Sequence, residues 1–214
     1  NVRESDARKR IESNLPGEFN LYNILAAVSY AKAAGIPSEK IQAGIEKVKS
    51  IRGRAEKITL DGLTRTDLSS DPRSVLGQTR QDFSVIVDYA HTPDSLEKLY
   101  QTYAGKYRIC VLGNTGGGRD RWKRPVMAGI AEKYCDEIIL TNEDPYNEDP
   151  RAIIREMAAG MKAKQPTLIL ARRAAIRAAL QKASKGDVVL ISGKGTDPCI
   201  CGPHGTREVW DDAT

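Results

Sequence analysis

Apolar residues follow two different patterns along this chain, and the change between them falls near Ala55. Before that point the spacing is helical and predicts two helices, from Phe19 to Ala34 and from Ser38 to Lys49. Gly35-Ile36-Pro37 would end the first helix, and Ser38 would be the N-cap of the second. The apolar positions form one stripe: Leu21, Ile24, Leu25, Val28, Ile41, Ile45 and Val48. A single stripe needs a partner, so we expect the tail of a domain whose body lies upstream of Asn1.

Beyond Ala55, short β-rich runs alternate with helical segments. Strands are expected over residues 83–87, 108–112, 137–140, 167–170 and 188–191, and helices over residues 93–103, 123–134, 150–162 and 173–184. Two further runs, 56–60 and 63–68, flank the hairpin signal Asp61-Gly62. This alternation predicts an α/β fold with a doubly wound, mostly parallel, Rossmann-like sheet. We place the first domain at residues 1–52, incomplete, and the second at residues 53–214.

Composition narrows the class of protein. The chain has 214 residues, of which 40% are hydrophobic and 29% charged, as in an ordinary globular protein. It contains no apolar run long enough for a membrane span and no apolar segment behind its charged start, so we expect neither a membrane anchor nor a signal peptide. The net charge of +5 is spread along the chain, and only 6% of residues are aromatic, which argues against nucleic-acid binding.

The four cysteines, Cys110, Cys135, Cys199 and Cys201, lack the paired spacing of a disulfide framework. A reducing, cytoplasmic location fits this usage. Cys199 and Cys201 could form a metal site with His204, but the usual zinc spacing and a fourth ligand are absent. We therefore expect no metal site and a Gly/Pro-rich loop with incidental thiols.

Polar clusters follow three of the expected strands. They are Asp88-Tyr89-Ala90-His91-Thr92-Pro93, then Gly113-Asn114-Thr115-Gly116-Gly117-Gly118-Arg119, and Ser192-Gly193-Lys194-Gly195. Ligands of open α/β sheets bind where such strands end, so the three clusters predict one site. Neither glycine cluster is a Walker A loop, because no Gly-Lys-Ser/Thr follows at the required spacing.

The ordered motifs GEFNLYNILAA, DYAHTPDSLE, GGGRDRWKRP, TNEDPYNEDP and GKG resemble the C-terminal part of the Mur ligase family. The likeness runs from about Gly17 to Asp211 and is greatest to the UDP-N-acetylmuramoyl-tripeptide synthetase (MurE) type, which adds the third residue of the peptidoglycan stem peptide. It implies that one more helix follows Asp211 in the family, so the chain would be cut at both ends.

For the nucleotide, the resemblance implies that Asp88 contacts the ribose hydroxyls and that Asn23 contacts the adenine edge. Asn20 would share that face or only cap its helix, and Asp88 could instead cap the turn after its strand. The resemblance also implies that Arg54 reaches the nucleotide when the domains close. A solvated linker arginine is the alternative.

Around the reacting groups, the resemblance implies Lys123 for phosphate and Arg119 for the amino-acid carboxylate. Arg124 adds a further donor of the same kind, and the three glycines would let the backbone approach an anion. His91 could act as a general base, since its pKa normally lies near neutrality. The helix start at Thr92-Pro93 favours the alternative that its imidazole only orients or caps that helix.

Two departures from the family pattern concern the amino-acid substrate. Family members that take meso-diaminopimelate carry DNPR where this chain has Glu143-Asp144-Pro145-Tyr146, so the arginine that grips the distal carboxylate is replaced by Tyr146. Asp144 would suit a distal ammonium instead. Gly193 begins the GKG motif, and Asp197 replaces a glutamate that contacts the amino acid. Both departures favour lysine or ornithine.

The resemblance implies an ATP-dependent ligase that forms an amide through an acyl phosphate. Its partners would be UDP-N-acetylmuramoyl-alanyl-glutamate and a free diamino acid, and it would act as a monomer. The phosphate-binding loop and the Mg²⁺ ligands would lie upstream, so this chain alone would be inactive. Alternatives are a folylpolyglutamate synthetase-like ligase and a non-catalytic nucleotide-binding Rossmann domain. The absence of G-x-G-x-x-G makes an NAD-dependent dehydrogenase less favoured.

Overall fold

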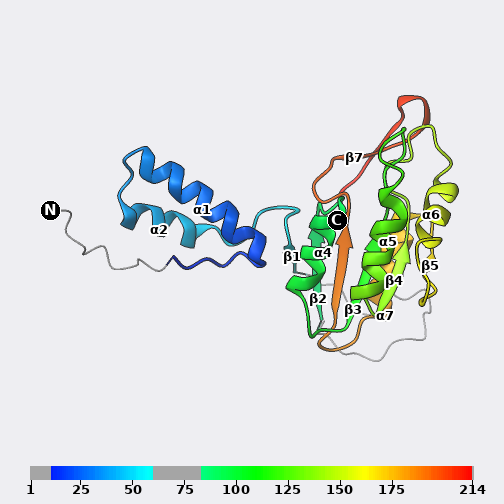
Figure 1. Cartoon of the computed structure of the whole chain (residues 1–214), viewed down its shortest axis with the longest axis horizontal. Helices are drawn as coiled ribbons and strands as arrows, with labels where there is room; N and C mark the ends of the chain where they lie inside the picture. Colours follow the sequence, from blue (N-terminus) through cyan, green and yellow to red (C-terminus); the bar gives the residue numbers. More distant parts are fainter. Residues whose placement is uncertain (1–10, 60–82, 214) are drawn as a thin grey trace. The chain divides into compact units, whose positions relative to one another are not determined.

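The computed structural model describes residues 11–59 and 83–213 (Figure 1). The chain divides into two compact units between Ile51 and Arg52, and each unit is considered by itself. The hairpin signal at Asp61-Gly62 and the predicted strand over 63–68 lie outside the described residues. In the described part of the chain, no helix has both the length and the apolar character needed to cross a membrane.

The first unit contains helices α1 (Glu18–Ala33) and α2 (Ser38–Lys47). The predicted helices are thus confirmed, with ends shifted by one or two residues. Gly35 makes the turn between them with φ of +76°, a value that costs glycine little. Ser38 is the first helical residue and Pro37 occupies the cap position, so the predicted Ser38 N-cap was wrong.

Much of the predicted apolar stripe in the first unit faces outward. Val28 is buried, whereas Leu21 and Leu25 are more than half exposed and Val48 is 39% exposed. Two helices alone bury too little apolar surface to form a core, which agrees with the sequence pattern.

The second unit is built on a six-stranded sheet in the order β1-β2-β6-β3-β4-β5. The strands are β1 (Glu56–Ile58), β2 (Ser84–Asp88), β3 (Arg108–Leu112), β4 (Glu137–Leu140), β5 (Thr167–Leu168) and β6 (Val188–Ser192). Only β1 runs antiparallel to its neighbour; the pairs from β2 to β5 are parallel. The predicted mostly parallel α/β sheet is confirmed.

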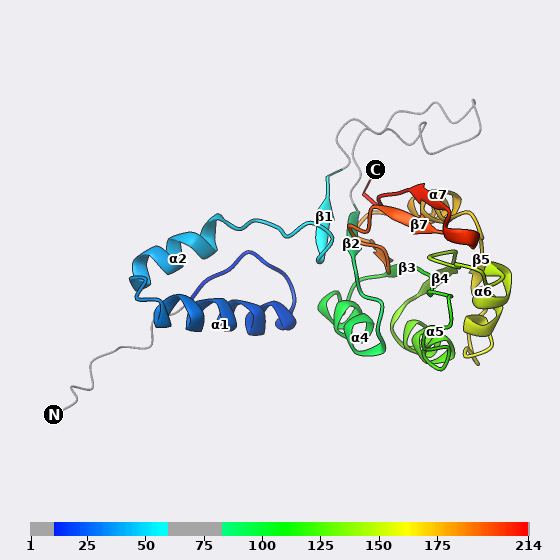
Figure 2. The ribbon, with the colours of Figure 1, turned by 90° about the horizontal axis from the view of Figure 1, so that it is seen from above.

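Within residues 83–213, four helices cover this sheet. They are α4 (Pro93–Thr102), α5 (Lys123–Tyr134), α6 (Pro150–Ala158) and α7 (Arg172–Lys182). Figure 2 shows α4 and α5 on one face of the sheet and α7 on the other. Right-handed crossovers explain this arrangement: the chain moves in one direction from β2 to β5, and it returns to β6 through α7. The sheet is therefore wound from both sides.

Alternation along the parallel strands supplies two apolar layers, one on each face. On the α7 face, Val87, Val111 and Ile191 pack with Ala175 and Ala179 of the helix. The small alanines let α7 lie close to the sheet. All five side chains are at most 1% exposed, so this layer is a buried apolar core beneath the ends of the strands.

A second, two-stranded sheet joins β7 (Cys199–Cys201) to β8 (Arg207–Val209) in antiparallel register. A 3₁₀ turn, η1 (Pro203–Gly205), connects the two strands. The sequence analysis expected a Gly/Pro-rich loop here, and that expectation was wrong. Strands of three residues on either side of Gly202, Pro203 and Gly205 do not stand out from a loop in the sequence.

Cys110 and Cys135 form a disulfide. The sequence analysis found no disulfide framework in the cysteine spacing, so this pair was not predicted. Cys110 lies in β3 and Cys135 directly follows α5, and both are fully buried. The crossover brings these positions together although 25 residues separate them, and this closeness is not visible in their spacing.

Candidate functional site at the carboxyl edge of the sheet

The carboxyl ends of β2, β3, β4 and β6 lie at one edge of the sheet, because these strands are parallel. Asp88 at the end of β2 is in register with Ser192 at the end of β6, and Leu112 is in register with Leu140. The Gly193 N–H donates to the Asp88 carbonyl at 3.2 Å, which links the two loops. The sequence motifs that follow these strands are thus collected at one place.

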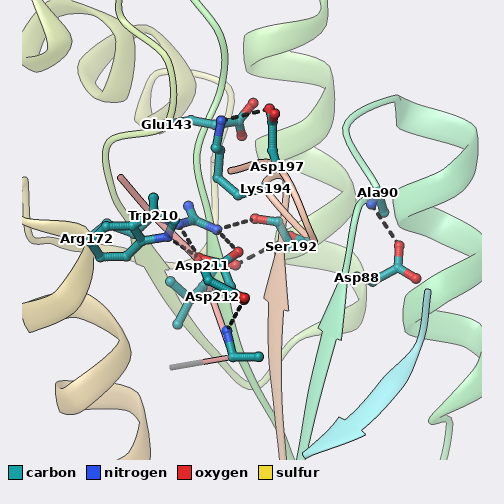
Figure 3. A network of polar contacts seen from close by, with 12 residues as sticks. Asp88, Ala90, Glu143, Arg172, Ser192, Lys194, Asp197, Trp210, Asp211 and Asp212 are labelled. Carbon is teal, nitrogen blue, oxygen red and sulfur yellow. Dashed lines mark hydrogen bonds and ion pairs between the residues drawn. The ribbon is translucent and has the colours of Figure 1, made fainter. Parts of the chain in front are cut away.

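Asp88 is buried, and its carboxylate accepts two backbone hydrogen bonds, from Ala55 N at 2.5 Å and from Ala90 N at 2.7 Å. Figure 3 shows the bond to Ala90. These contacts match the alternative given in the sequence analysis, in which Asp88 caps the turn after its strand. Burial raises the pKa of the Asp88 carboxyl above its ordinary value, although both N–H groups act in the opposite direction.

Arg54, Tyr89 and His91 form a stacked group beside Asp88. The Arg54 guanidinium lies 4.7 Å from the centre of the Tyr89 ring, and the Tyr89 and His91 rings meet edge to face at 4.7 Å. His91 Nδ1 is 2.9 Å from the Tyr89 carbonyl oxygen. The cap of α4 is Thr92, whose side chain accepts from Ser95 N, so His91 does not cap that helix.

Lys123 begins α5 and is 8% exposed. Its ammonium donates to the His91 carbonyl at 3.2 Å and thereby connects α5 to the loop after β2. A lysine with one neutral acceptor retains donors for an anion. Arg119, by contrast, is exposed in the loop before α5.

Arg124 has a structural environment. Its side chain is fully buried and donates to Glu156 at 2.7 Å, to Glu148 at 3.0 Å and to the Thr115 carbonyl at 3.2 Å. Glu148 also accepts from Gly118 N at 3.0 Å. The sequence analysis counted Arg124 among the donors for a ligand anion, and this was wrong because two carboxylates already occupy it.

Gly116 and Gly117 allow the loop after β3 to pack against the loop after β4. A Cβ atom on Gly116 would lie 2.3 Å from the Pro145 carbonyl oxygen, and one on Gly117 would lie 2.8 Å from the Tyr146 ring. Gly116 N donates to the Asp144 carbonyl at 2.7 Å. Close approach of two loops therefore accounts for Gly116 and Gly117, which the sequence analysis had assigned to anion binding.

Lys194 is the centre of the charged cluster in this site. Its ammonium contacts both oxygens of Asp144, at 2.9 and 2.8 Å, and one oxygen of Asp197 at 2.8 Å. Figure 3 shows the contact with Asp197. The pKa of Lys194 lies above its ordinary value: burial disfavours the charge, but the hydrogen bonds to both carboxylates outweigh burial. Asp144, expected to be open to a substrate ammonium, is instead buried and paired.

Glu143 lies beneath this cluster and is 3% exposed. Thr115 Oγ1 donates to one of its oxygens at 2.7 Å, while the other is buried without a hydrogen-bond partner. Burial raises the pKa of this carboxyl. Gly193 has φ of +109°, and a Cβ there would lie 2.2 Å from the Glu143 carboxyl oxygen. Only glycine fits this position without displacing Glu143.

Tyr146 adopts φ of +49°, which is uncommon for a residue with a side chain. Its N–H donates to the Cys201 carbonyl at 3.0 Å, so β7 holds the loop after β4. Burial first, and then the adjacent Cys201 thiol, raise the pKa of the Tyr146 phenol, while Arg119 acts in the opposite direction.

The sequence analysis gave no role to Lys194, Glu143 or Arg172. Arg172 begins α7 and is buried; it pairs with Asp212 at 2.6 Å and donates to the Ser192 carbonyl at 2.9 Å. Figure 3 shows this network. Of these three residues, only Lys194 could have been singled out from the sequence. It lies between two glycines just after an apolar strand, where a lysine is not expected to face solvent.

Asn20 and Asn23, expected at the adenine, belong to the first unit. Asn20 is buried, and its amide donates to the Pro16 carbonyl at 2.6 Å and accepts from the Asn23 amide at 3.3 Å. Asn20 therefore ties the start of α1 to Pro16 but does not cap the helix, because α1 has no side-chain cap and Gly17 occupies the cap position, whereas Asn23 is exposed. In the described residues, no group of three or more His, Cys, Asp or Glu side chains could hold a metal.

Fold and site together define a doubly wound α/β domain with a cluster of polar and charged groups at the carboxyl edge of its sheet. The family model described as Mur ligase, glutamate ligase domain, matches residues 73–195. This match spans more than half of the chain and includes every polar strand end described above. The chain belongs to the Mur ligase family.

Two curated relatives are similar over most of the chain. A UDP-N-acetylmuramoyl-L-alanyl-D-glutamate--2,6-diaminopimelate ligase of Syntrophomonas wolfei is 44% identical over 86% of this chain and 35% of its own length. A UDP-N-acetylmuramyl-tripeptide synthetase of Roseiflexus sp. is 39% identical over 98% of this chain and 38% of its own length. The chain therefore spans little more than a third of these relatives.

Two solved structures are similar to this chain in fold. A UDP-N-acetylmuramoyl-L-alanyl-D-glutamate--2,6-diaminopimelate ligase is 31% identical with a TM-score of 0.63, and the match covers 94% of this chain and 38% of that one. A folylpolyglutamate synthase of Mycobacterium tuberculosis reaches a TM-score of 0.60 at 21% identity, over 86% of this chain and 39% of that one. At that identity the likeness concerns the fold alone.

Proposed function

We propose that this chain is the C-terminal part of an ATP-dependent amide ligase that adds a diamino acid to UDP-N-acetylmuramoyl-alanyl-glutamate. The observation that carries the proposal is the gathering of the family's motifs at one sheet edge: Asp88, the loop 143–146 and the loop 193–197. The printed names of the relatives, which denote diaminopimelate ligases and a tripeptide synthetase, support the reaction class.

In this proposal the nucleotide is a substrate held at the β2 end of the edge. The Arg54 guanidinium is exposed and braced by the Tyr89 ring, so it is available to a phosphate or ribose oxygen. Asp88 keeps free lone pairs for ribose hydroxyls beyond its two backbone bonds. We assign Asn23, and to a lesser degree Asn20, to the adenine edge. The residues that bind Mg²⁺ would lie outside the described part of the chain.

The chemistry consists of two displacements. The peptide carboxylate attacks the γ-phosphorus of ATP, giving an acyl phosphate and ADP, and the incoming amine then displaces phosphate to form the amide. Cations that hold the anionic groups in line do most of this work. We assign Lys123 to the phosphoryl group and Arg119 to the amino-acid carboxylate. The backbone carbonyl of His91 accepts from the Lys123 ammonium and helps to hold this lysine in place.

The amino-acid side chain would lie between the loops 143–146 and 193–197. Lys194 neutralises one of its two carboxylate partners, so Asp144, Lys194 and Asp197 together retain one negative charge. Asp197 is the more exposed carboxylate, with 35% of its side chain accessible. We therefore assign Asp197 to a distal ammonium, with Tyr146 beside it where an arginine would select a carboxylate. Lysine or ornithine fits this site better than meso-diaminopimelate.

The test compares the 214-residue chain with the complete protein that contains it. Each is incubated with ATP, Mg²⁺, UDP-N-acetylmuramoyl-alanyl-glutamate and lysine, and the nucleotide product is weighed by mass spectrometry. We expect the tripeptide product from the complete protein and none from the chain alone. Product from neither protein, with any of lysine, ornithine or meso-diaminopimelate, would refute the proposed reaction.

A further inference from the structure

Two thiols lie side by side next to the candidate site. Cys199 and Cys201 occupy the two ends of β7, and their sulfur atoms are 3.8 Å apart. Residues two apart on a strand point to the same side, so both thiols share one face while Ile200 between them is buried. Both cysteines are free and partly exposed, unlike the buried Cys110–Cys135 pair.

The backbone of Cys201 connects these thiols to the site. Its N–H donates to Asp144 Oδ1 at 2.7 Å, and its carbonyl accepts from Tyr146 N at 3.0 Å. The strand β7 is thus the support on which the loop after β4 rests. Any change in the length of β7 must move these two hydrogen bonds.

We propose that Cys199 and Cys201 are a reversible modification site, which forms an intramolecular disulfide by exchange with a small-molecule disulfide and thereby loosens the hold of β7 on Asp144 and Tyr146.

The exchange proceeds in two balanced steps. One cysteine thiolate attacks a sulfur of the small-molecule disulfide; a mixed disulfide forms, and one small thiol leaves with a proton. The second cysteine thiolate then attacks the protein sulfur of the mixed disulfide; the Cys199–Cys201 bond forms, and the second small thiol leaves. Two protein thiols are oxidised, and one small-molecule disulfide is reduced to two thiols.

Geometry explains why this bond would be felt by the loop after β4. Cα atoms two residues apart on an extended strand are about 6.6 Å apart. Disulfides span about 4.4–6.8 Å and prefer about 5.5–6 Å. Closing the bond therefore shortens β7 by up to about 1 Å and draws Cys201 away from Asp144 and Tyr146. The strain in so short a ring also makes the bond easy to reduce.

The experiment treats the full chain with oxidised glutathione at pH 8, blocks the remaining thiols with iodoacetamide, and weighs the tryptic peptide 195–207, which contains both cysteines. A mildly alkaline pH is used because burial and the neighbouring Cys201 raise the pKa of the Cys199 thiol. We expect this peptide to lose two hydrogen atoms and to carry no alkyl group. After reduced glutathione is added, it should carry two.

Cys199→Ser and Cys201→Ser are the matched variants. Each should remain as a single alkylated thiol or a mixed disulfide with glutathione, with no loss of two hydrogen atoms. Amide hydrogen exchange at Tyr146 and Cys201 gives the second readout: we expect about tenfold faster exchange in the oxidised chain and no change in Cys199→Ser treated in the same way.

Two results would overturn the inference. One is a peptide 195–207 that keeps two alkylated thiols after oxidation, or that is linked to a second chain on a non-reducing gel. The other is a disulfide that forms without any change in exchange at Tyr146, which would refute the coupling. Neither readout depends on enzymatic activity, so the outcome is independent of the proposed ligase function.

Discussion

The Lys194 ammonium contacts both carboxylate oxygens of Asp144, at 2.9 and 2.8 Å, with 1% of the lysine side chain exposed. This pair joins the loop after β6 to the loop after β4. The two loops follow strands that have β3 between them in the sheet, so the pair bridges the end of β3 and fixes the separation of the loops. The Lys194–Asp144 pair of the candidate site is therefore formed by the fold itself, without a bound substrate.

Replacing Lys194 by methionine should destabilise the second unit. The change leaves Asp144 buried without its cation, and breaking such a pair typically costs about 3–5 kcal/mol; we expect the lower end because Asp197 is partly hydrated. Lys182→Met is the control, since Lys182 pairs with Glu137 near the surface and should cost less than about 1 kcal/mol. Urea unfolding measures both, and equal losses would contradict this account of Lys194.

Glu143→Gln should change how stability depends on pH. Burial raises the folded-state pKa of Glu143, so its contribution to stability is complete below the unfolded-state pKa and is lost as pH rises through the folded-state pKa. Glu143→Gln has no carboxyl group at this position, so its stability does not fall as pH rises in this way. The unfolding free energy of the variant, relative to that of the parent, should therefore rise between pH 4 and pH 8.

Glu132→Gln should change the relative unfolding free energy in the opposite direction over the same pH range. Three backbone N–H groups, those of Lys162, Ala163 and Lys164, lower the pKa of Glu132. Its contribution is present above the unfolded-state pKa and is lost as pH falls, so this variant should lose relative stability between pH 4 and pH 8. Slopes of the same sign in both variants would refute the assignment for Glu143.

Gly116→Ala should separate the loop after β3 from the loop after β4. The added Cβ would meet the Pro145 carbonyl at 2.3 Å, and overpacking of this kind costs about 1–3 kcal/mol. Gly118→Ala is the control: Gly118 has φ of +74° and open space around it, so it tests backbone strain without a clash. Amide exchange at Tyr146 should increase in Gly116→Ala alone, and an equal increase in both variants would count against loop packing.

Tyr146→Arg should shift the amino-acid preference of the complete protein toward meso-diaminopimelate. An arginine at this position can bind a distal carboxylate with two parallel hydrogen bonds, which the tyrosine cannot provide. We expect the ratio of kcat/KM for meso-diaminopimelate over lysine to rise roughly tenfold to a hundredfold. Tyr146→Phe is the matched control and should leave that ratio close to the parent value. An unchanged ratio in Tyr146→Arg would remove Tyr146 from the specificity site.

Regular periodicity made most of the fold predictable. The helix from Lys123 to Tyr134 was predicted to the residue, and the parallel strands were each predicted within two residues of their observed ends. The short strands β7 and β8 were not predicted, since they carry too little alternation to stand out from a loop. The Cys110–Cys135 disulfide was equally hidden, because its formation depends on how α5 crosses the sheet.

The candidate site was predictable in place but not in its contacts. Strand ends and polar motifs located Asp88, Asp144 and Gly193 correctly at one edge. Which charges are already satisfied depends on partners far away in sequence: Asp144 and Lys194 are 50 residues apart, and Arg124 and Glu156 are 32 residues apart. Sequence alone therefore assigned to substrates two charged groups that the fold itself uses.

The most direct test of the central claim is phosphate release by the complete protein with ATP, Mg²⁺ and UDP-N-acetylmuramoyl-alanyl-glutamate. Lysine, ornithine, meso-diaminopimelate and no amino acid are offered in parallel. The account predicts release that depends on lysine or ornithine. Release that depends on meso-diaminopimelate alone would keep the ligase and contradict the assignment of Asp197 and Tyr146, and release with no amino acid would contradict the ligase itself.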